Sequence, residues 1–509
     1  MKKCIILLFL SLFVLKSNAQ WQYPAQGKEI NYRIAGFSLP EVPQTTQYTL
    51  EVTEGLYDNE NFFKTHIIKR CTSKTNQLIV ELPSWGQSYT WRFLYTHPGN
   101  RTTSSPLYHF STGKPPVVDT HLYRLRIIKN AKKYQQAYVI CDKSRVIYDM
   151  KGNAIWYLPN IPGIIESNGE VRDLKPTFKG TMTFVTNNMA YEITYDGQLL
   201  WKPPNIGQVS QDSIERYHHE INILSNGNYM VLGNELIPWE WRKDSNGDSA
   251  LSLVSAEQMS QNTGKTYPRI SFGTVIEYDQ ANNVVWSWRS SQYFLEQQTN
   301  QKTLKNLKNL FDSHENGFAF DEKNKNLYVS FKNFSQIFKI NYPDGIVTNV
   351  YGKSGDPITD QKAPFCHQHS VKIFKNGNIC LFNNNICHPD ETPTALMMQE
   401  PAGGKGNLKK IWEYKYPYKG DFTELRKAQG TSGGNVMELP GGEILVSMCN
   451  PYGNVFIVSM DKKLLWDAVL EVWNLVEKKW SAQSAYRYSI ITSRNNLGHL
   501  IWRENIEGR

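Results

Sequence analysis

Short runs of alternating apolar and polar residues recur along the chain, and turn residues separate them. From about His121 onward they form a longer repeat, in which each unit closes on an aromatic residue shortly after a polar turn. Repeated four-stranded units, with aromatic residues packed between neighbours, are typical of a β-propeller. The pattern predicts a six-bladed β-propeller over residues 117–509, in which a last apolar run, His499 to Trp502, completes a blade or closes the ring. The six closing residues are Trp156, Trp201, Trp286, Tyr351, Trp412 and Trp466.

Residues 20–116 show shorter runs of the same alternating kind, such as Tyr48–Val52 and Ser88–Phe93. Their length and spacing predict a small antiparallel β-sandwich of fibronectin type III-like character. Lys114-Pro115-Pro116 follows as a stiff junction. The expected fold class is therefore all-β, with a small N-terminal β-sandwich (20–116) before the propeller (117–509).

Residues 1–19 have the organisation of a secretory signal peptide. Two lysines precede an apolar run from Ile5 to Leu15, and Ser17-Asn18-Ala19 forms a cleavage-type ending before Gln20. No later stretch has the apolar length needed to cross a bilayer. We therefore expect the mature protein to be periplasmic or secreted, without a membrane span.

The 509-residue chain carries a formal net charge of +9 at pH 7, and loss of the three lysines of the signal peptide lowers it to +6. Lysine and arginine are scattered, without a basic stripe or a nucleic-acid-binding motif, so no nucleic-acid partner is expected. A mild positive field still suits an anionic substrate.

Six cysteines remain after signal cleavage, which is too few for a disulfide scaffold in so long a chain. Cys380 and Cys387 are close enough in the sequence for a loop staple, although the sequence does not establish the connectivity. The other four are Cys71, Cys141, Cys366 and Cys449.

A histidine stands before a predicted β-hairpin at two places in the repeat. His369 precedes an alternating run and the turn Asn376-Gly377, and His219 precedes a similar run and the turn Asn226-Gly227. In both copies the histidine lies seven residues before the turn asparagine. Alternation along the strand places the neighbouring His218 on the opposite face, where we expect it to pack.

Two further copies of the hairpin complete this pattern. His314 occupies the same slot before a longer turn, and Gly434 occupies it in the fourth copy. The innermost strand of each propeller blade lines the central channel, so residues at one phase of the repeat converge on one ring. We therefore expect His219, His314 and His369 to face one another across the channel.

Three interpretations of such a ring compete. Three histidines can bind zinc, copper or iron. Separate imidazoles can instead act as nucleophile and general acid, since they titrate near neutral pH. A ring of polar side chains can also fill a channel together with water, without any catalysis. The pattern GxxxxGK[ST] is absent from the sequence, which argues against nucleotide-dependent group transfer.

Three short motifs carry a resemblance to a known family: His218-His219-Glu220, His314-Glu315-Asn316 and Gln368-His369-Ser370. Together with the repeated Asn-Gly-Asn turns, they resemble the bacterial arylsulfate sulfotransferases, which are periplasmic six-bladed propellers with a small N-terminal β-sandwich. In that family a channel histidine is sulfurylated and passes the group from a phenyl sulfate to a phenol, by a ping-pong mechanism without a nucleotide sulfate donor. The resemblance implies an exported enzyme that needs no cofactor and no metal.

The resemblance also assigns residues. His369 matches the nucleophile, His219 and His314 match the two other channel histidines, and Asn316 matches the asparagine of the His-x-Asn motif. The family has an arginine eighteen residues after the second histidine, and Lys332 occupies that slot here. The departure matters, because arginine offers a planar fork to two oxygens whereas lysine is a single-point charge.

These assignments imply how a sulfuryl group would be transferred. A neutral His369 attacks sulfur, while Lys332 and Asn316 hold the sulfuryl oxygens. His219 or His314 protonates the departing phenolate and later takes the proton of the phenol acceptor. Two hydroxyl residues near the fourth hairpin are further candidates for substrate binding: Thr431 and Ser432.

Two other functions stay open. A propeller polysaccharide lyase would use histidine and lysine for proton abstraction and charge neutralisation at a uronate. A secreted glycan-binding propeller would need no catalytic group. The resemblance also raises the expectation of a homodimer formed through the N-terminal sandwich.

Overall fold

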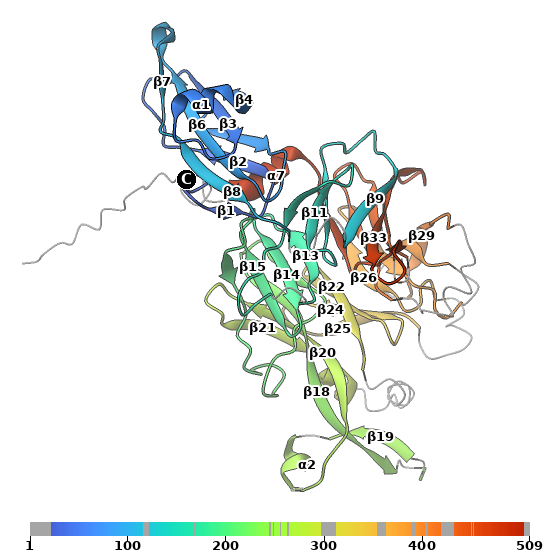
Figure 1. Cartoon of the computed structure of the whole chain (residues 1–509). Coiled ribbons are helices and arrows are strands. Elements are labelled where there is room, and N and C mark those ends of the chain that lie inside the picture. The colour runs from blue at the N-terminus through green and yellow to red at the C-terminus, as the bar shows by residue number, and fades with distance from the viewer. Residues whose placement is uncertain are drawn as a thin grey trace, which may run out of the picture. The chain divides into compact units, whose positions relative to one another are not determined.

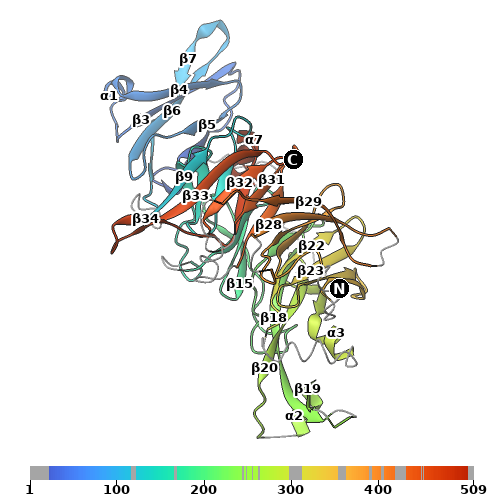
Figure 2. The ribbon, with the colours of Figure 1, turned by 90° about the vertical axis from the view of Figure 1, so that its right-hand side faces the viewer.

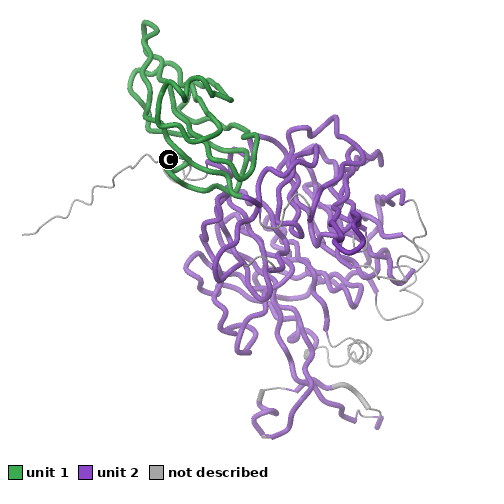
Figure 3. Tube along the Cα trace, in the orientation of Figure 1, with its two compact units in different colours: residues 1–113 green, residues 114–509 purple. Residues whose placement is uncertain are grey.

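The computed structural model describes residues 22–115, 122–165, 169–243, 246–247, 249–254, 256–261, 264–296, 312–353, 363–388, 392–402, 406–418, 432–448, 450 and 452–502. The expected signal peptide and Thr431 lie outside these described residues. The chain divides into two compact units, residues 1–113 and 114–509 (Figure 3). Within the described ranges, no helix is long and apolar enough to span a membrane.

Unit 1 consists mainly of strands in two sheets, and its fibronectin type III-like character stays a prediction. One sheet has the order β1-β8-β6-β3-β4 with β7 paired to β6, and the other pairs β2 with β5. Strand alternation buries Phe37, Trp91 and Phe110, and Phe37 makes edge contacts with both other rings. The elements are β1 (Glu29–Ile30), β2 (Ile34–Ser38), β3 (Gln47–Glu54), α1 (Glu60–Thr65), β4 (Ile67–Ser73), β5 (Gln77–Glu81), β6 (Ser88–Thr96), η1 (Pro98–Asn100), β7 (Thr102–Ser104) and β8 (Tyr108–Thr112).

The described residues of unit 2 form six sheets of antiparallel strands, and the prediction of an all-β propeller is confirmed. Six sheets match the six closing residues counted in the sequence, while the number of blades itself stays a prediction. The sheet orders are β12-β11-β10-β35, β13-β14-β15-β16, β17-β18-β20-β21 with β19 on β18, β22-β23-β24-β25, β26-β27-β28-β29 and β30-β31-β32-β33-β34 with β9 on β33.

Most strands of unit 2 are short. The long pair β18 and β20 extends from one side of the unit, with β19 and α2 at its far end (Figure 1). The bounds are β9 (Tyr123–Lys129), β10 (Tyr138–Cys141), β11 (Val146–Asp149), β12 (Ala154–Tyr157), β13 (Arg172–Pro176), β14 (Met182–Thr186), β15 (Met189–Ile193), β16 (Leu199–Trp201), β17 (Ile221–Ile223), β18 (Tyr229–Lys243), β19 (Ser249–Leu253), α2 (Ala256–Gln261), β20 (Arg269–Tyr278), β21 (Val284–Arg289), α3 (Ser290–Glu296), β22 (Glu315–Asp321), β23 (Asn326–Phe331), β24 (Gln336–Asn341), β25 (Val347–Gly352), β26 (His369–Ile373), β27 (Ile379–Asn383), β28 (Thr394–Gln399), β29 (Lys409–Lys415), β30 (Asn435–Glu438), β31 (Ile444–Ser447), β32 (Asn454–Val458), β33 (Leu464–Asn474), β34 (Lys479–Ala482), β35 (Tyr488–Ile491) and α7 (Arg494–Ile501).

The six closing aromatic residues lie on the fourth strand of their sheets, and four of them link one sheet to the next. In each of these four, the indole N–H donates a hydrogen bond to a backbone carbonyl in the turn before the outer strand of the following sheet. The bond from Trp466 joins the last sheet to the first and so closes the ring. The four pairs are Trp156 with Tyr195, Trp286 with Pro343, Trp412 with Met460 and Trp466 with Met150.

Two strands from the beginning and the end of the unit 2 sequence also hold the ring together. β35 completes the first sheet by pairing with β10. β9 joins the last sheet by pairing with β33, and the two strands lie side by side in both views (Figure 1, Figure 2). The strand expected at His499–Trp502 is wrong, because these residues form the end of α7 and its C-cap. The Ser493 side chain caps α7 by accepting a hydrogen bond from the Asn496 backbone N–H. Leu497 and Leu500 of α7 are buried, so the apolar run of the sequence packs as a helix.

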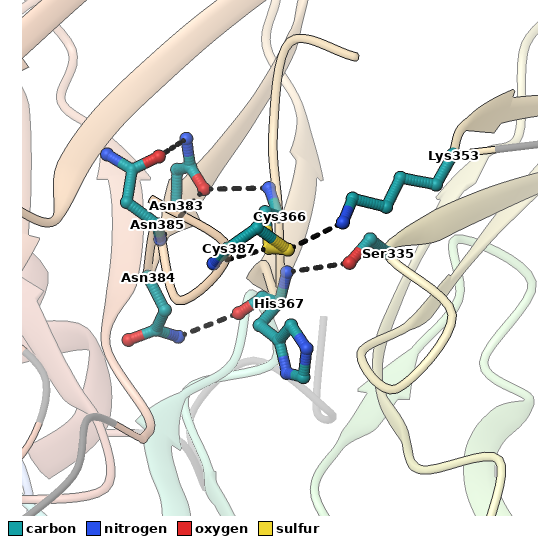
Figure 4. Close-up of a disulfide and its surroundings, with 8 residues drawn as sticks. All are labelled: Ser335, Lys353, Cys366, His367, Asn383, Asn384, Asn385 and Cys387. Atoms are coloured by element: carbon teal, nitrogen blue, oxygen red, sulfur yellow. Dashed lines mark hydrogen bonds between the residues drawn. A yellow bond between two sulfur atoms is a disulfide. The ribbon is translucent and has the colours of Figure 1, made fainter. Parts of the chain in front are cut away.

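One disulfide is present in the described residues, and it is not the loop staple considered from the sequence. Cys366 pairs with Cys387, with 6.0 Å between their Cα atoms (Figure 4). Cys380 is a free cysteine that is fully buried within β27. Strand alternation turns its side chain into the apolar core beside Phe382 and Phe374, away from the loop that carries Cys387.

Candidate active site

The inner edge strands of the six sheets begin around one cavity of about 360 Å³. These strands are β35, β13, β17, β22, β26 and β30, and several neighbours among them contact each other, such as β22 with β26. Each of these strands has one residue, at its first position or up to two positions before it, that occupies the same place in the repeat. Five of these six residues line the cavity. The six residues are Tyr486, Arg172, His219, His314, His369 and Gly434.

His369 is held in one tautomer by hydrogen bonds at both ring nitrogens. Its Nδ1–H donates to the Gly434 carbonyl at 2.7 Å, and its Nε2 accepts from the Tyr486 hydroxyl at 3.0 Å. Burial, together with the nearby charge of Arg487, holds the pKa of this imidazole well below its usual value near 6.5. His369 therefore presents a neutral ring whose Nε2 lone pair can act as a nucleophile once the Tyr486 hydroxyl turns away from it.

Gly434 explains why glycine replaces histidine in the fourth copy of the hairpin. Its φ is +88°, and a Cβ atom at this position would lie 2.3 Å from the Phe382 ring. Only glycine fits this backbone and this space. The Gly434 carbonyl can then approach His369 and fix its tautomer. This repeat position therefore supports the His369 side chain and adds no further side chain to the cavity.

The neutral state of His369 leads to a first prediction. At pH 6.5, where an exposed histidine is about half protonated, we expect the His369 Nε2 to remain unprotonated because burial lowers the pKa of the ring. The measurement is a titration of the imidazole ¹⁵N shifts, with His369 assigned by its loss in His369→Gln. Half-protonation of His369 at or above pH 6.5 would contradict this account of the site.

His219 and His218 form a pair, which corrects the expectation that His218 packs on an opposite face. Their Nδ1 atoms share a short hydrogen bond, and the His218 Nε2–H donates to the Asn234 Oδ1 at 2.7 Å. Alternation fails here because His219 has a φ of +62°, outside the strand conformation. Burial lowers the pKa of His218 to about 4, and it holds the pKa of His219 well below 6.5.

His314 lies between His219 and a carboxylate. Its ring centroid is 5.6 Å from that of His219, and its Nδ1–H donates to the Asp312 Oδ2 at 3.0 Å. The Asp312 Oδ1 accepts from the backbone N–H of His314 at 2.8 Å, which supports the left-handed φ of +56° at this histidine. All three predicted histidines line the one cavity, as expected from the repeat.

Three cations border the same cavity: Lys143, Arg172 and Lys332. Lys332 follows β23, and burial lowers the pKa of its ammonium below the usual 10.5. Within the described part of the chain, this ammonium makes no hydrogen bond or ion pair. Arg172 pairs with Glu170 at 3.0 Å, and its guanidinium lies 5.4 Å from the centroid of the Tyr486 ring. The cavity can therefore hold an anionic group beside His369.

The remaining predicted site residues are placed differently. Asn316 does not line the cavity; it is fully buried, and its Nδ2–H donates to the Gln368 carbonyl at 2.8 Å. It thus fixes the backbone immediately before His369. Ser432 does line the cavity, whereas Thr431 lies outside the described residues.

The residues that directly follow Tyr486, Arg172 and His219 in the sequence form a buried ionic network. The Arg487 guanidinium binds the Asp173 carboxylate at 2.7 Å and the Glu220 carboxylate at 3.1 Å. Glu220 also pairs with Lys372, and Asp173 pairs with Lys175 at 2.7 Å. These bonds join four sheets across the channel, so the network holds the strand starts, and with them the ring, in register.

A metal site among the three channel histidines finds no support in the geometry. Among the described residues, one group of His, Cys, Asp or Glu side chains lies close enough to share an ion: Cys366, His367 and Cys387. Two of its members form the disulfide of Figure 4. The ring nitrogens of His219, His314 and His369 do not form such a group, although the centroid of His219 lies 5.6 Å from that of His314 and 6.1 Å from that of His369.

The sequence of unit 2 decides the family. Residues 124–415, more than half of the chain, match the family model described as Arylsulfotransferase (ASST). The chain belongs to the ASST family. The resemblance found in the short histidine motifs is therefore confirmed, and the matched range contains all three histidines of the ring. No curated protein matches the chain.

The solved structures that match this ASST-family chain share little of its sequence. A protein of unknown function from Bacteroides caccae is 13% identical, covers 65% of this chain and 93% of its own, and has a TM-score of 0.37. An auxiliary nutrient binding protein from Bacteroides ovatus is 11% identical with 90% of both chains covered and a TM-score of 0.31. Regucalcin from Agrobacterium tumefaciens is 10% identical, covers 72% of this chain and 94% of its own, and has a TM-score of 0.33. At these scores the likenesses carry no argument about function.

Sequence reasoning missed two residues of this ASST-family site, Arg172 and Tyr486. Arg172 lies seven residues before the turn Lys179-Gly180, which is the same offset that identified His219 and His369. The offset alone would have found it, had the turn not been required to contain asparagine. Tyr486 carries no such signal, because β35 leads into α7 instead of a hairpin.

Proposed function

We propose that this ASST-family protein is an exported arylsulfate sulfotransferase that moves a sulfuryl group from an aryl sulfate to a phenolic acceptor through a sulfo-histidine at His369. The observation that carries the proposal is the neutral imidazole of His369, whose Nδ1–H is committed to Gly434 and whose Nε2 is directed to Tyr486 at the cavity. An imidazole fixed in this way is a nucleophile in a defined direction.

The proposed reaction has two half-reactions. In the first, the His369 Nε2 lone pair forms a bond to sulfur while the bond between sulfur and the aryl oxygen breaks, and the phenolate takes a proton. In the second, the oxygen of the acceptor phenol loses its proton and attacks sulfur, and the bond between sulfur and Nε2 breaks. Lys332 and Arg172 stabilise the negative charge of the sulfuryl oxygens in both steps.

A trapping experiment tests the proposal. With 4-nitrophenyl sulfate alone, we expect a burst of about one nitrophenolate per protein and a mass increase of one sulfuryl group on the peptide that carries His369. Added phenol should discharge the label and yield phenyl sulfate. Continuous release of inorganic sulfate, or an unlabelled folded protein, would overturn the proposal. An absorbance rise with uronate-containing glycans would instead support a lyase.

We expect the Tyr486 hydroxyl to stay hydrogen-bonded at the reaction centre while the His369 Nε2 bonds to sulfur. It donates to the Nε2 of His369 in the resting site, and it is free to donate to a sulfuryl oxygen once the Nε2–sulfur bond forms. Tyr486→Phe removes one hydrogen bond and keeps the ring beneath Arg172, so we expect kcat/KM for the donor to fall about tenfold. Steady-state kinetics with 4-nitrophenyl sulfate measure the effect, and an unchanged kcat/KM would exclude this role.

Lys332 is expected to be needed as a cation, without a strict requirement for lysine. Lys332→Ala leaves the sulfuryl oxygens without their unpaired cation, so kcat/KM should fall about 10²-fold. Lys332→Arg keeps the charge in the slot where the family has arginine, and we expect it to retain at least about a tenth of the wild-type value. Equal losses in both variants would show that the side chain's shape, and not its charge, is required.

A further inference from the structure

We propose that Asp312 positions His314 as the group that carries the proton in sulfuryl transfer, and that His219 does not carry it. The inference rests on the proposed function, because it assigns a role within the same reaction. It concerns the aryl oxygen, which must gain a proton when it leaves and lose one when an acceptor attacks. A carboxylate behind a cavity histidine is the feature that distinguishes the two candidates.

The Asp312 carboxylate binds His314 through both of its oxygens. Oδ2 accepts from the His314 Nδ1–H at 3.0 Å, and Oδ1 accepts from the His314 backbone N–H at 2.8 Å. Burial alone would raise the pKa of Asp312, but these bonds and the nearby histidine charge lower it below its usual value near 3.8. The carboxylate is therefore ionised, and its negative charge faces the Nδ1–H of His314.

This arrangement leaves the opposite nitrogen of His314 for the substrate. With Nδ1–H committed to Asp312, the ring's Nε2 makes no hydrogen bond within the described residues, and His314 lines the cavity. In the imidazolium form Nε2–H donates a proton, and in the neutral form Nε2 accepts one. The side chain is about one-third exposed, so it can exchange protons with a substrate in the cavity.

His219 lacks the carboxylate. Its Nδ1 is occupied by His218, no Asp or Glu side chain among the described residues pairs with it, and burial holds its pKa well below 6.5. A neutral His219 has no proton to give on the leaving side at neutral pH. The ring of His219 instead packs edge-on against those of His314 and Tyr486, which shapes the cavity wall.

The charged and titratable groups that face His314 come from several elements, and Asp312 is the one anion in direct contact with it among the described residues. Lys332 follows β23, and its own backbone N–H donates to the His314 carbonyl at 3.1 Å. The other groups that interact electrostatically with His314 are His218, His219 and His369.

The proton balance closes over one turnover. In the donor half-reaction, His314 Nε2–H gives its proton to the aryl oxygen as the sulfur–oxygen bond breaks, and Nε2 of His369 takes the sulfuryl group. In the acceptor half-reaction, the neutral Nε2 of His314 removes the proton of the acceptor phenol as its oxygen attacks sulfur. His369 is released, and His314 is protonated again.

Two donors with leaving groups of different acidity test the assignment. 4-Nitrophenolate leaves without protonation, whereas the phenolate of phenyl sulfate depends on it. We expect Asp312→Asn to lower kcat/KM about 10²-fold for phenyl sulfate and only a few-fold for 4-nitrophenyl sulfate. Asparagine keeps the Oδ1 acceptor for the backbone N–H, so this variant preserves the turn. His219→Gln is the matched control, and it should lower both values by the same factor.

The ratio between the donors separates the possible outcomes. It is measured on one protein sample, so it does not depend on the folded fraction. Equal losses of Asp312→Asn on both donors, or a donor-dependent loss in His219→Gln, would overturn the assignment while transfer in the wild type stands. A wild type that transfers no sulfuryl group would overturn the proposed function and this assignment together.

A readout without substrate completes the test. In the wild type we expect the ¹⁵N shifts of the neutral His314 ring to report a proton on Nδ1, because Asp312 accepts it. In Asp312→Asn, the amide nitrogen can face Nδ1 as a donor, and the proton should move to Nε2. An unchanged tautomer in Asp312→Asn would overturn the positioning role.

Discussion

His369→Ala is expected to abolish sulfuryl transfer, with kcat/KM for 4-nitrophenyl sulfate reduced by about 10⁴-fold or more. The loss is this large because the variant removes the atom that bonds to sulfur. The Nδ1 atoms of His219 and His314 are also occupied, by His218 and Asp312, but among the described residues the Tyr486 hydroxyl donates to the Nε2 of His369 alone. The measurement combines nitrophenolate release in the presence of phenol with mass spectrometry for the sulfuryl label.

His499→Ala serves as the control for this experiment. His499 lies in α7 and does not line the cavity, and its Nε2–H donates to the Phe178 carbonyl at 3.0 Å. His499→Ala removes the same side-chain group as His369→Ala but leaves the cavity unchanged, so we expect wild-type kinetics. If His369→Ala retained more than about a hundredth of the wild-type rate, the nucleophile would have to be another residue.

The ring of histidines was predictable because one physical rule governs it. A propeller repeats its strands, so a polar residue at a fixed offset from a hairpin turn returns to the same place around the channel. His219, His314 and His369 obeyed this rule, and all three line the cavity. Arg172 obeys it as well, and only its Lys-Gly turn hid it.

The rest of the site depends on contacts that one sequence does not reveal. Tyr486 enters the ring because β35 returns from the end of unit 2 to complete the first sheet. His218 joins its neighbour because His219 takes a left-handed conformation, which breaks the alternation on which the prediction relied. Asn316 was expected to bind substrate, but its amide reaches a carbonyl across the sheets, since burial requires its donor to be satisfied.

The buried network around Glu220 has no counterpart in any local pattern, yet it joins the strand starts that carry the ring. Glu220 is fully buried and faces three cations: Arg487, Lys372 and Lys175. These charges hold the pKa of Glu220 below its usual value near 4.5, although burial alone would raise it. A carboxylate in such a position balances charges that would otherwise be left in the interior.

Glu220→Gln is therefore expected to destabilise unit 2 by about 3–5 kcal/mol, because it keeps the shape of the side chain and leaves buried cations without their shared anion. Urea unfolding followed by tryptophan fluorescence measures the change. The same substitution at Glu240, whose partners Arg242 and Lys265 are largely exposed, should leave the midpoint almost unchanged. Because the folded-state pKa of Glu220 is lowered, its contribution is complete above pH 4.5 and is lost as the pH falls further. The gap between Glu220→Gln and wild type should thus narrow in acid, and a gap independent of pH would mean that packing, and not charge, connects the strands beneath the ring.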